Sequence, residues 1–281
     1  MPAFAQMESE TKIQSVVALP RPACFCLEQS LFCGQAFRWE RKEGAFFGVA
    51  GDRVLTVAQT ETQLLFYNAS RRDVREFWVP YFSLDEDYPA VNALFARDPL
   101  LREAGKAAGG IRILRQDPWE ALCSFIFSSN NNIPRITGMI RRFCRLFGQE
   151  LEAGAHGFPP PDRIAGLSPE ALAPVRAGFR AKYVLDAAQK AAGGLDLQKI
   201  AALPLDEARR LLMTIKGVGP KVADCVLLFG YHRLEALPKD VWINRVLAAA
   251  YPGGLPDFIR PFAGIAQQQL FHYARTTGAF S

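Results

Sequence analysis

The chain has 281 residues, 49% of them hydrophobic and 22% charged, which is enough for one large domain or two ordinary domains. This composition excludes a largely disordered protein. The net charge of +5 is compatible with an anionic polymer as partner, but it is equally typical of a mildly basic protein without one. No apolar run reaches the length of a transmembrane helix, and the first residues lack the apolar core of a signal peptide.

The cysteines are scattered, with no CxxC pair and no histidine at metal-ligand spacing. They are Cys24, Cys26, Cys33, Cys123, Cys144 and Cys225. A reduced, intracellular protein is the simplest interpretation. Because no cysteine quartet lies near the C-terminus, we expect no iron–sulfur cluster.

The region from about Gln14 to Asn68 has a strand-like pattern. Its short segments are Gln35–Glu40, Phe46–Ala50, Arg53–Ala58 and Gln63–Tyr67. Close spacing predicts an antiparallel meander rather than βαβ units. Within it, Cys33–Trp39 (CGQAFRW) places an exposed-looking Gly-Gln beside an aromatic pair, which alone is most simply a β-turn with core aromatics.

The pattern changes after this region. We expect helix from Arg71 to Lys106 and a short returning strand at Ile111–Leu114. Asp117 and Pro118 fit the cap and first position of a helix, so the domain boundary is placed here, between residues 10–115 and 116–281. Further helices are expected around Trp119–Phe127, Ile136–Phe147, Ser168–Val175, Ala181–Ala192, Leu197–Ala201, Val241–Ala250 and Phe258–Thr276.

The stretch from Asp206 to Asp240 organises the helical half. Apolar residues recur at helical spacing up to Ile215, a glycine turn follows, and Pro220 fits the start of a second helix. The N–H groups at that start form an anion site. Lys221 lies in the same turn, which is the wrong end of a helix for a cation, and such a departure marks a candidate functional residue.

Lys221 and Asp240 are the candidate catalytic pair. A helix N-terminus and partial burial both lower the pKa of a lysine, which favours an amine nucleophile, and a nearby carboxylate can transfer protons. The alternatives are a lysine that grips phosphate and an aspartate that only caps a helix at Val241. The asparagine run at 130–132, with Arg135 behind it, likewise fits either a plain turn or contacts to bases and phosphates.

Five segments together resemble the helix-hairpin-helix glycosylase superfamily, and more narrowly its 8-oxoguanine DNA glycosylases. They are CGQAFRW, DPWEALCSFIFSSNNNIPRITGM, GFRAKYV, IKGVGPKVADCVLLF and PKDVW, and the similarity extends from about Cys33 to Phe271. A single hairpin would be weak evidence, but these segments in this order are specific. The resemblance implies an α+β fold, in which an N-terminal TBP-like antiparallel sheet domain precedes an all-helical glycosylase domain.

The resemblance implies a bifunctional base-excision repair enzyme acting on double-stranded DNA that contains 8-oxoguanine, preferably opposite cytosine. Lys221 would form a Schiff base with the sugar C1′, Asp240 would support base loss, and β-elimination would cleave the strand as an AP lyase. No cofactor would be required, although main-chain carbonyls of the hairpin would hold a structural cation. We expect a monomer, cytoplasmic with the bacterial nucleoid, or nuclear in a eukaryote.

The resemblance also assigns residues to the base pocket. The main-chain carbonyl of Gly34 would accept from N7–H of the oxidised base, a hydrogen that guanine lacks. Cys225 and Phe271 would sandwich the extruded base, and Gln267 would bind its Watson–Crick edge.

Other positions would hold the rest of the DNA. Asn130, Arg135 and Arg180 would contact the orphaned cytosine, Phe179 would be the wedge that kinks the duplex, and Gly217 and Gly219 would form the phosphate clamp. Trp242 is a departure, because relatives carry there a histidine that contacts a phosphate, whereas tryptophan offers one N–H donor and no charge.

Two rival functions follow from the same residues. A glycosylase of this superfamily with alkylated or deaminated bases as substrates is disfavoured by the base-pocket set. A non-catalytic DNA-binding module built on the hairpin does not explain Lys221 together with Asp240, and it predicts binding without strand cleavage.

Overall fold

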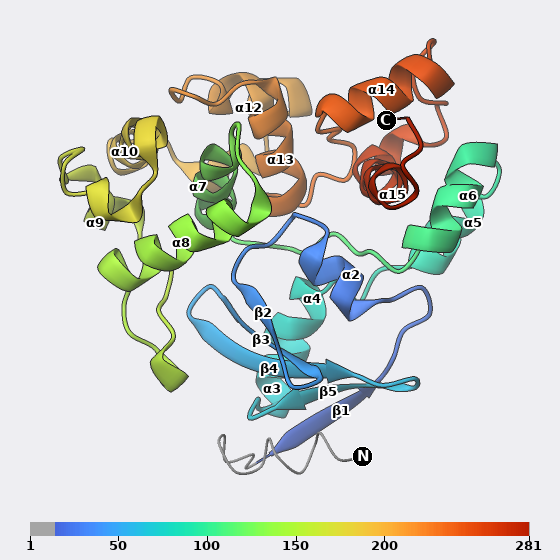
Figure 1. Cartoon of the computed structure of the whole chain (residues 1–281), viewed down its shortest axis with the longest axis horizontal. Helices are drawn as coiled ribbons and strands as arrows, with labels where there is room; N and C mark the ends of the chain where they lie inside the picture. The colour runs from blue at the N-terminus through green and yellow to red at the C-terminus, as the bar shows by residue number, and fades with distance from the viewer. Residues whose placement is uncertain (1–14, 281) are drawn as a thin grey trace.

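The computed structural model describes residues 15–280 and shows an antiparallel sheet on one side of a group of helices (Figure 1). The sheet has five strands in the order β1-β5-β4-β3-β2. Their bounds are Val16–Pro20 (β1), Trp39–Lys42 (β2), Ala45–Ala50 (β3), Arg53–Gln59 (β4) and Gln63–Tyr67 (β5). The predicted antiparallel meander and the α+β class are both confirmed.

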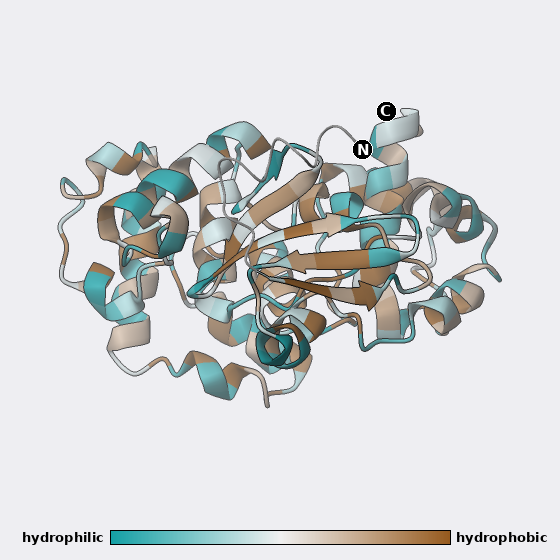
Figure 2. Cartoon of the chain, turned by 90° about the horizontal axis from the view of Figure 1, so that it is seen from below, coloured by the Kyte–Doolittle hydropathy of each residue, from teal (hydrophilic) through white to brown (hydrophobic). Residues whose placement is uncertain are grey.

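The sheet has its own aromatic core. Trp39 packs edge-on against Trp78, and its Nε1 donates to the hydroxyl of Tyr81 at 2.9 Å. Gly48 lies opposite Trp39 in the strand register and leaves space for the indole, since a Cβ there would lie 2.3 Å from the ring. The strands are correspondingly coloured mostly as hydrophobic residues in Figure 2.

A short helix, α2 (Leu27–Phe32), lies where only strands are predicted. Leu27 and Leu31, one turn apart, are both buried in the sheet core. The strand predicted from Gln35 is wrong up to residue 38, because β2 begins only at Trp39. Gln35 itself is fully buried, so its exposed-looking position is also wrong.

The predicted strand at Ile111–Leu114 is wrong, although the segment is buried as its apolar pattern suggests. The carbonyl of Ala108 accepts the backbone N–H of Ile111 at 3.0 Å, and side chains, not a neighbouring strand, accept the other three N–H groups of the segment. The acceptors are Ser30 Oγ for Arg112 (3.0 Å), the Tyr88 hydroxyl for Ile113 (2.7 Å) and Gln35 Oε1 for Leu114 (2.9 Å). The segment therefore joins α2 to the helices without adding to the sheet.

The helix predicted from Arg71 to Lys106 is divided. It consists of α3 (Arg71–Asp73), a π-helical turn at Val74–Trp78, α4 (Val79–Tyr81), α5 (Tyr88–Phe95) and α6 (Pro99–Ala108). Asp87 and Asp98 cap the last two helices by accepting from backbone N–H groups at 3.0 and 2.9 Å. A proline in the first turn of each helix cannot continue a preceding one, which explains the breaks.

The remaining α-helices are α7 (Pro118–Ser128), α8 (Ile133–Phe147), α9 (Pro161–Ala165), α10 (Ala181–Ala192), α11 (Leu197–Ile200), α12 (Leu205–Leu212), α13 (Pro220–Gly230), α14 (Val241–Ala250) and α15 (Ala263–Thr277). Short 3₁₀ turns lie at Glu152–Gly154, Ala173–Val175, Gly178–Arg180 and Arg260–Phe262. The helix predicted at Ser168–Val175 is wrong, because Pro174 and the left-handed Arg176 (φ 60°) allow only a 3₁₀ turn. The helix predicted from Phe258 begins later, at Ala263, after Pro261.

The helical core also includes α5 and α6. Tyr88, Phe95 and Leu101 are buried among residues of the later helices, and α6 packs along α15 (Figure 1). The boundary at residues 115/116 stays a prediction, and residues 10–14 of the expected first domain lie outside the described residues. Within the described part, no helix is both long and apolar enough to cross a bilayer.

Glu86 connects the segment before α5 to the loop after α13. Its Oε1 lies 2.6 Å from His232 Nε2 and 2.6 Å from the Arg115 guanidinium. Burial raises the pKa of Glu86, but the hydrogen bonds and charges of these two partners outweigh burial and lower it to about 2. The carboxylate is therefore ionised at neutral pH.

Candidate active site

A cavity of about 500 Å³ brings together residues that are far apart in the sequence. Its lining includes Gly34, Lys221, Cys225, Asp240, Trp242, Gln267 and Phe271. Gly34 follows α2, and the other residues lie on α13, on α15 and at the start of α14. The structure thus places both candidate catalytic residues and the whole predicted base pocket around one space. The roles of the individual residues stay predictions.

One face of α13 forms a wall of this cavity. Lys221, Cys225 and Phe229 are spaced four residues apart, so they lie above one another on the helix. Phe125 of α7 stacks on Phe229 with ring centroids 5.2 Å apart, and Lys221 Nζ lies 5.5 Å from the centroid of the Phe125 ring. The lysine amine therefore lies near the ring of Phe125, at the first turn of its own helix.

Cys225 lies one turn after Lys221 on α13 and is buried. Burial raises the pKa of its thiol to about 11, although the charge of Lys221 opposes this rise. A thiol with this pKa is protonated at neutral pH and is a poor nucleophile. Cys225 is therefore suited to form a polarizable apolar wall for a flat ring.

Asp240 serves as the N-cap of α14, where its Oδ1 accepts from the backbone N–H of Ile243 at 2.8 Å. A carboxylate has two oxygens, so this cap leaves further acceptor capacity for the cavity. The two interpretations of Asp240, helix cap and catalytic carboxylate, are therefore compatible. Trp242 lines the same cavity, and the Arg245 guanidinium lies 5.5 Å from its ring centroid.

Gly34 needs to be glycine because of its backbone. Its φ is +92°, which residues with a Cβ rarely adopt. Space is not the reason, since a Cβ would meet only Ile133 Cδ1 at 3.8 Å.

Several lining residues were not singled out in the sequence. They include Phe125, Gln268 and Arg275. Arg275 follows Phe271 by one turn of α15, with its guanidinium 5.2 Å from the ring centroid, so helical spacing from Phe271 could have identified it. Phe125 carried no such signal, because it lies in a nearly all-apolar helix whose faces cannot be told apart.

The residues predicted to hold the opposite strand meet at the loop between α7 and α8. Asn130 has a positive φ of 48° and is exposed. Arg180 is buried and donates from Nε and Nη2 to the carbonyl of Ser129 (2.8 and 2.6 Å) and from Nη2 to that of Asn130 (2.8 Å). Phe179 is 49% exposed, as a wedge requires, and its ring stacks under the Arg180 guanidinium at 4.4 Å.

Two positive charges converge behind this loop. Burial and the nearby charge of Arg135 lower the pKa of the Arg180 guanidinium. Such a like-charge pair is relieved by an acceptor or an anion placed between the two groups. In this structure Arg180 is engaged with the loop backbone, so its direct contact with a cytosine stays a prediction.

The two hairpin glycines differ. Gly217 has a φ of +80°, and a Cβ there would lie 2.3 Å from the ring of Tyr183. Gly219, the N-cap of α13, has a φ of −95°, and a Cβ there would meet no described atom within 4 Å. Gly217 therefore shapes the turn, whereas Gly219 leaves an open approach to the N–H groups of α13.

Polar contacts hold the hairpin together. Arg209 of α12 donates to Asp224 of α13 at 2.7 Å. The backbone N–H of Lys216 donates to Asp186 of α10 at 2.8 Å. Among residues 15–280, no three His, Cys, Asp or Glu side chains form a group that could hold a metal ion.

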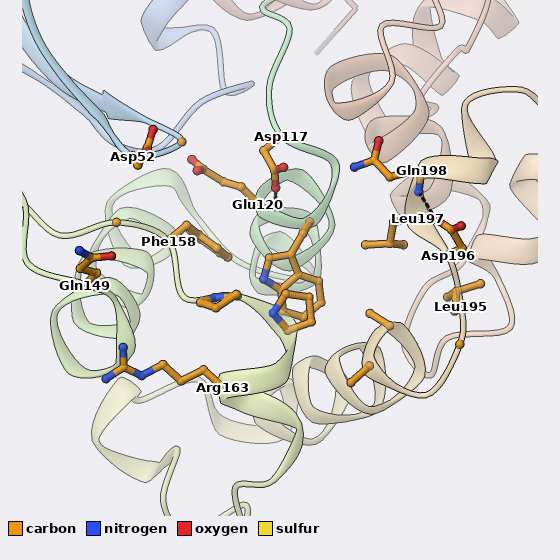
Figure 3. Close-up of a pocket in the computed structure, with 18 of the residues that line it drawn as sticks. Asp52, Asp117, Glu120, Gln149, Phe158, Arg163, Leu195, Asp196, Leu197 and Gln198 are labelled. Atoms are coloured by element: carbon orange, nitrogen blue, oxygen red, sulfur yellow. Dashed lines mark hydrogen bonds between the residues drawn. The ribbon is translucent and has the colours of Figure 1, made fainter.

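A larger cavity of about 740 Å³ lies elsewhere, between the start of α7, the segment before α9 and the end of α10 (Figure 3). Acidic and apolar side chains line it, among them Asp117, Glu120 and Leu197. Within the described chain its lining contains no lysine, cysteine or histidine, and it contains none of the predicted site residues. It therefore lacks a lysine such as the one that lines the smaller cavity.

Comparisons with known proteins decide the family. Residues 18–122 match the model described as 8-oxoguanine DNA glycosylase, N-terminal domain, and residues 123–253 match HhH-GPD superfamily base excision DNA repair protein. An N-glycosylase/DNA lyase of Saccharomyces cerevisiae is 33% identical over 258 residues, which cover 80% of this chain and 68% of the yeast protein. The chain belongs to the 8-oxoguanine DNA glycosylase family.

Solved structures of this family agree closely with the fold. An 8-oxoguanine glycosylase/lyase of Clostridium acetobutylicum, bound to double-stranded DNA with cytosine opposite 8-oxoG, superimposes with a TM-score of 0.88 at 35% identity. The match covers 94% of this chain and 97% of the other. MBOgg1, bound to a low-affinity DNA ligand, gives 0.88 at 40% identity, covering 95% and 98%. The chain is thus a base-excision DNA repair glycosylase with its sheet and helical regions arranged as in these relatives.

Proposed function

We propose that this glycosylase excises 8-oxoguanine from double-stranded DNA through Lys221 and then cleaves the strand by β-elimination. The observation that carries the proposal is the meeting of Lys221, Asp240 and Gly34 in one cavity of about 500 Å³. A cavity of this volume is in the range that binds small molecules, and it admits a purine. The yeast and Clostridium relatives, which are named as lyases as well as glycosylases, support the same reaction.

The base must first leave the duplex stack, which costs a few kcal/mol. The exposed ring of Phe179 fills the space that the base vacates, and the N–H groups at the start of α13 bind a backbone phosphate. In the cavity, Cys225 and Phe271 enclose the base. The Gly34 carbonyl accepts from N7–H, so guanine, which has a lone pair at N7, is repelled there.

The neutral amine of Lys221 attacks C1′ while the bond from C1′ to N9 breaks, and the base leaves with that electron pair and takes up a proton. The carboxylate of Asp240 stabilises the positive charge that develops on the sugar. Loss of the amine proton and opening of the sugar ring give the Schiff base. Removal of a C2′ proton then expels the 3′ phosphate, which breaks the strand.

The preference for cytosine opposite the lesion is part of the proposal. Asn130, Arg135 and Arg180 lie on adjacent segments and supply amide and guanidinium groups. Cytosine presents O2 and N3 as acceptors on the edge that pairs with guanine, so donors in this place favour it over thymine, whose N3 carries a hydrogen.

We further propose that no cofactor is required and that a cation binds at the hairpin. The carbonyls of Gly217 and Val218 accept no backbone hydrogen bond within residues 15–280, so they are available as oxygen ligands. A cation there would add positive charge beside a DNA phosphate.

We also propose that the enzyme acts as an intracellular monomer on chromosomal DNA, in the bacterial cytoplasm or in a nucleus.

Borohydride trapping tests the central step. It reduces a Schiff base to a stable amine, so wild-type protein should form a covalent complex with an 8-oxoguanine:cytosine duplex. Lys221→Gln should bind the same duplex without forming the adduct, whereas the exposed Lys199→Gln on α11 should react like wild type. Strand cleavage by Lys221→Gln at the wild-type rate would show that Lys221 is not the nucleophile.

A four-way substrate series tests the opposite-base preference. Excision is measured under single-turnover conditions with C, A, G or T opposite 8-oxoguanine. We expect the highest rate opposite C. Equal rates for the four pairs would refute the proposed contacts of Asn130, Arg135 and Arg180.

A further inference from the structure

We propose that Gln268 reads the extruded base together with Gln267, as the acceptor for the exocyclic amine on the Watson–Crick edge. The inference rests on the proposed function, since it concerns the same base in the same cavity. It assigns to a residue next to the predicted reader a specificity role of its own.

Three consecutive glutamines are buried on α15. Gln267, Gln268 and Gln269 are only 4%, 5% and 0% exposed. Burying an amide is costly unless its polar atoms find partners, so a run of three has a structural or functional cause. Gln267 and Gln268 both line the base cavity.

The first two amides are bonded to each other. Gln268 Nε2 donates to Gln267 Oε1 at 2.8 Å. This bond occupies one lone pair of Gln267 Oε1, and no acceptor within residues 15–280 binds the Gln267 NH2 group, so that group is available to a ligand. Gln268 Oε1 is buried and has no hydrogen-bond partner among residues 15–280. The pair therefore offers a donor on one amide and an unpartnered acceptor on the other.

This arrangement complements the edge of a guanine-type base. That edge carries the acceptor O6 beside two donors, N1–H and the N2 amine. The NH2 of Gln267 matches O6, and Gln268 Oε1 matches the amine side. On an adenine-type edge, the N6 amine replaces O6 and would face the NH2 of Gln267, donor against donor. A C2–H replaces the N2 amine, which leaves Gln268 Oε1 without a donor.

Gln269 provides a matched control on the same helix. It is also fully buried, and its Nε2 donates to Asn92 Oδ1 of α5 at 2.8 Å. Its Oε1 likewise has no partner in the described chain. It faces α5 and α6, where it lines a different cavity. Replacing it therefore tests the cost of losing a buried amide without touching the base.

The experiment compares two lesions, 8-oxoguanine and 8-oxohypoxanthine, each opposite cytosine. They differ only in the N2 amine, and both keep the N7–H that Gly34 would bind. Single-turnover excision rates are measured for wild type, Gln268→Met and Gln269→Met, with melting temperatures as a check on folding. Methionine has a similar length and no amide, so the packing volume is largely kept.

Wild type should excise 8-oxoguanine about tenfold faster than 8-oxohypoxanthine, as expected for one hydrogen bond. In Gln268→Met this ratio should fall close to 1, and in Gln269→Met it should stay at the wild-type value. A wild-type ratio near 1, which needs no variant to fold, would overturn the inference. So would an unchanged ratio in Gln268→Met. Excision of neither lesion by wild type would instead overturn the proposed function, and the inference with it.

Discussion

The cavity around Lys221 and the loop between α7 and α8 are adjacent, but different kinds of contact hold their residues in place. In the cavity, Lys221 and Cys225 are fixed on α13, and Gln267 and Phe271 on α15, so helix packing sets their positions. In the loop, backbone carbonyls are held by the guanidinium of Arg180. The groups proposed to react with the base thus stand on packed helices, whereas the groups proposed to bind the opposite strand depend on a few polar contacts. Substitutions in the cavity should therefore impair excision, and substitutions in the loop should impair the preference for the opposite base.

The largest effect is expected from Asp240→Asn. Asparagine is as good an N-cap as aspartate, so α14 and the melting temperature should be kept while the carboxylate charge is lost. Excision should slow by roughly 10²- to 10⁴-fold. Asp87→Asn, which changes the equivalent cap of α5 outside the cavity, should leave the rate unchanged. A wild-type rate in Asp240→Asn would reduce Asp240 to a helix cap.

Gly217→Ala should show how far the stability of the protein depends on the glycine turn before α13. The positive φ and the contact with Tyr183 both oppose a Cβ, so we expect a loss of about 2–4 kcal/mol in the free energy of unfolding. Gly219→Ala should change stability much less, because space is open there, and should mainly weaken DNA binding. Denaturant unfolding and a binding titration separate the two. Equal loss of stability in both variants would contradict this distinction.

Arg180→Ala should change the opposite-base preference without preventing formation of the Schiff base. Removing its bonds to Ser129 and Asn130 should lower the ratio of excision opposite C to excision opposite A by about tenfold, since roughly one well-placed hydrogen bond is lost. Borohydride trapping should still occur. Arg142→Ala removes a similar bond to the carbonyl of Val175, so it serves as the control whose ratio should not change.

The smallest effect, on the pH dependence of stability, is expected at Glu86, whose carboxylate links His232 after α13 to the segment before α5. Its folded-state pKa is about 2, below the usual value of 4.5, so its stabilising contribution is present above about pH 4.5 and is lost as the pH falls towards 2. In Glu86→Gln, thermal unfolding should therefore depend less on pH in this range. Because the pair is only half-buried, the difference should stay below about 1 kcal/mol. Glu103→Gln, at an exposed pair, should behave like wild type.

The sequence predicted the parts of the fold that repeat locally. The meander and helices such as Ala181–Ala192 follow from periodicity and spacing. The strand prediction at Ile111–Leu114 fails because an apolar run indicates burial but not the partners of its backbone. For three of its four N–H groups these partners are the side chains of Ser30, Tyr88 and Gln35. The helix α2 was missed because six residues are too few to show a helical period among strands.

The site was predicted differently. Local rules indicated the unusual position of Lys221 and the cap position of Asp240, and the structure bears out the cap. That Gly34 and Gln267 lie beside them follows only from the way α2, α13 and α15 pack, and the family resemblance was needed to anticipate it. Gln268 could not be distinguished from Gln269 by sequence, since a single residue step around α15, about 100°, separates the cavity wall from the contact with α5.

The raised pKa of Cys225 makes its thiol resistant to oxidation. The substrate of the enzyme arises from oxidative damage, so the enzyme works where peroxides attack proteins as well as DNA. The thiolate is the form that peroxides oxidise, and burial raises the pKa of Cys225 to about 11 and that of Cys33 and Cys144 to about 12. Near neutral pH these thiols stay protonated and react slowly. The burial that gives the pocket a flat apolar wall therefore also protects that wall from the oxidants that create its substrate.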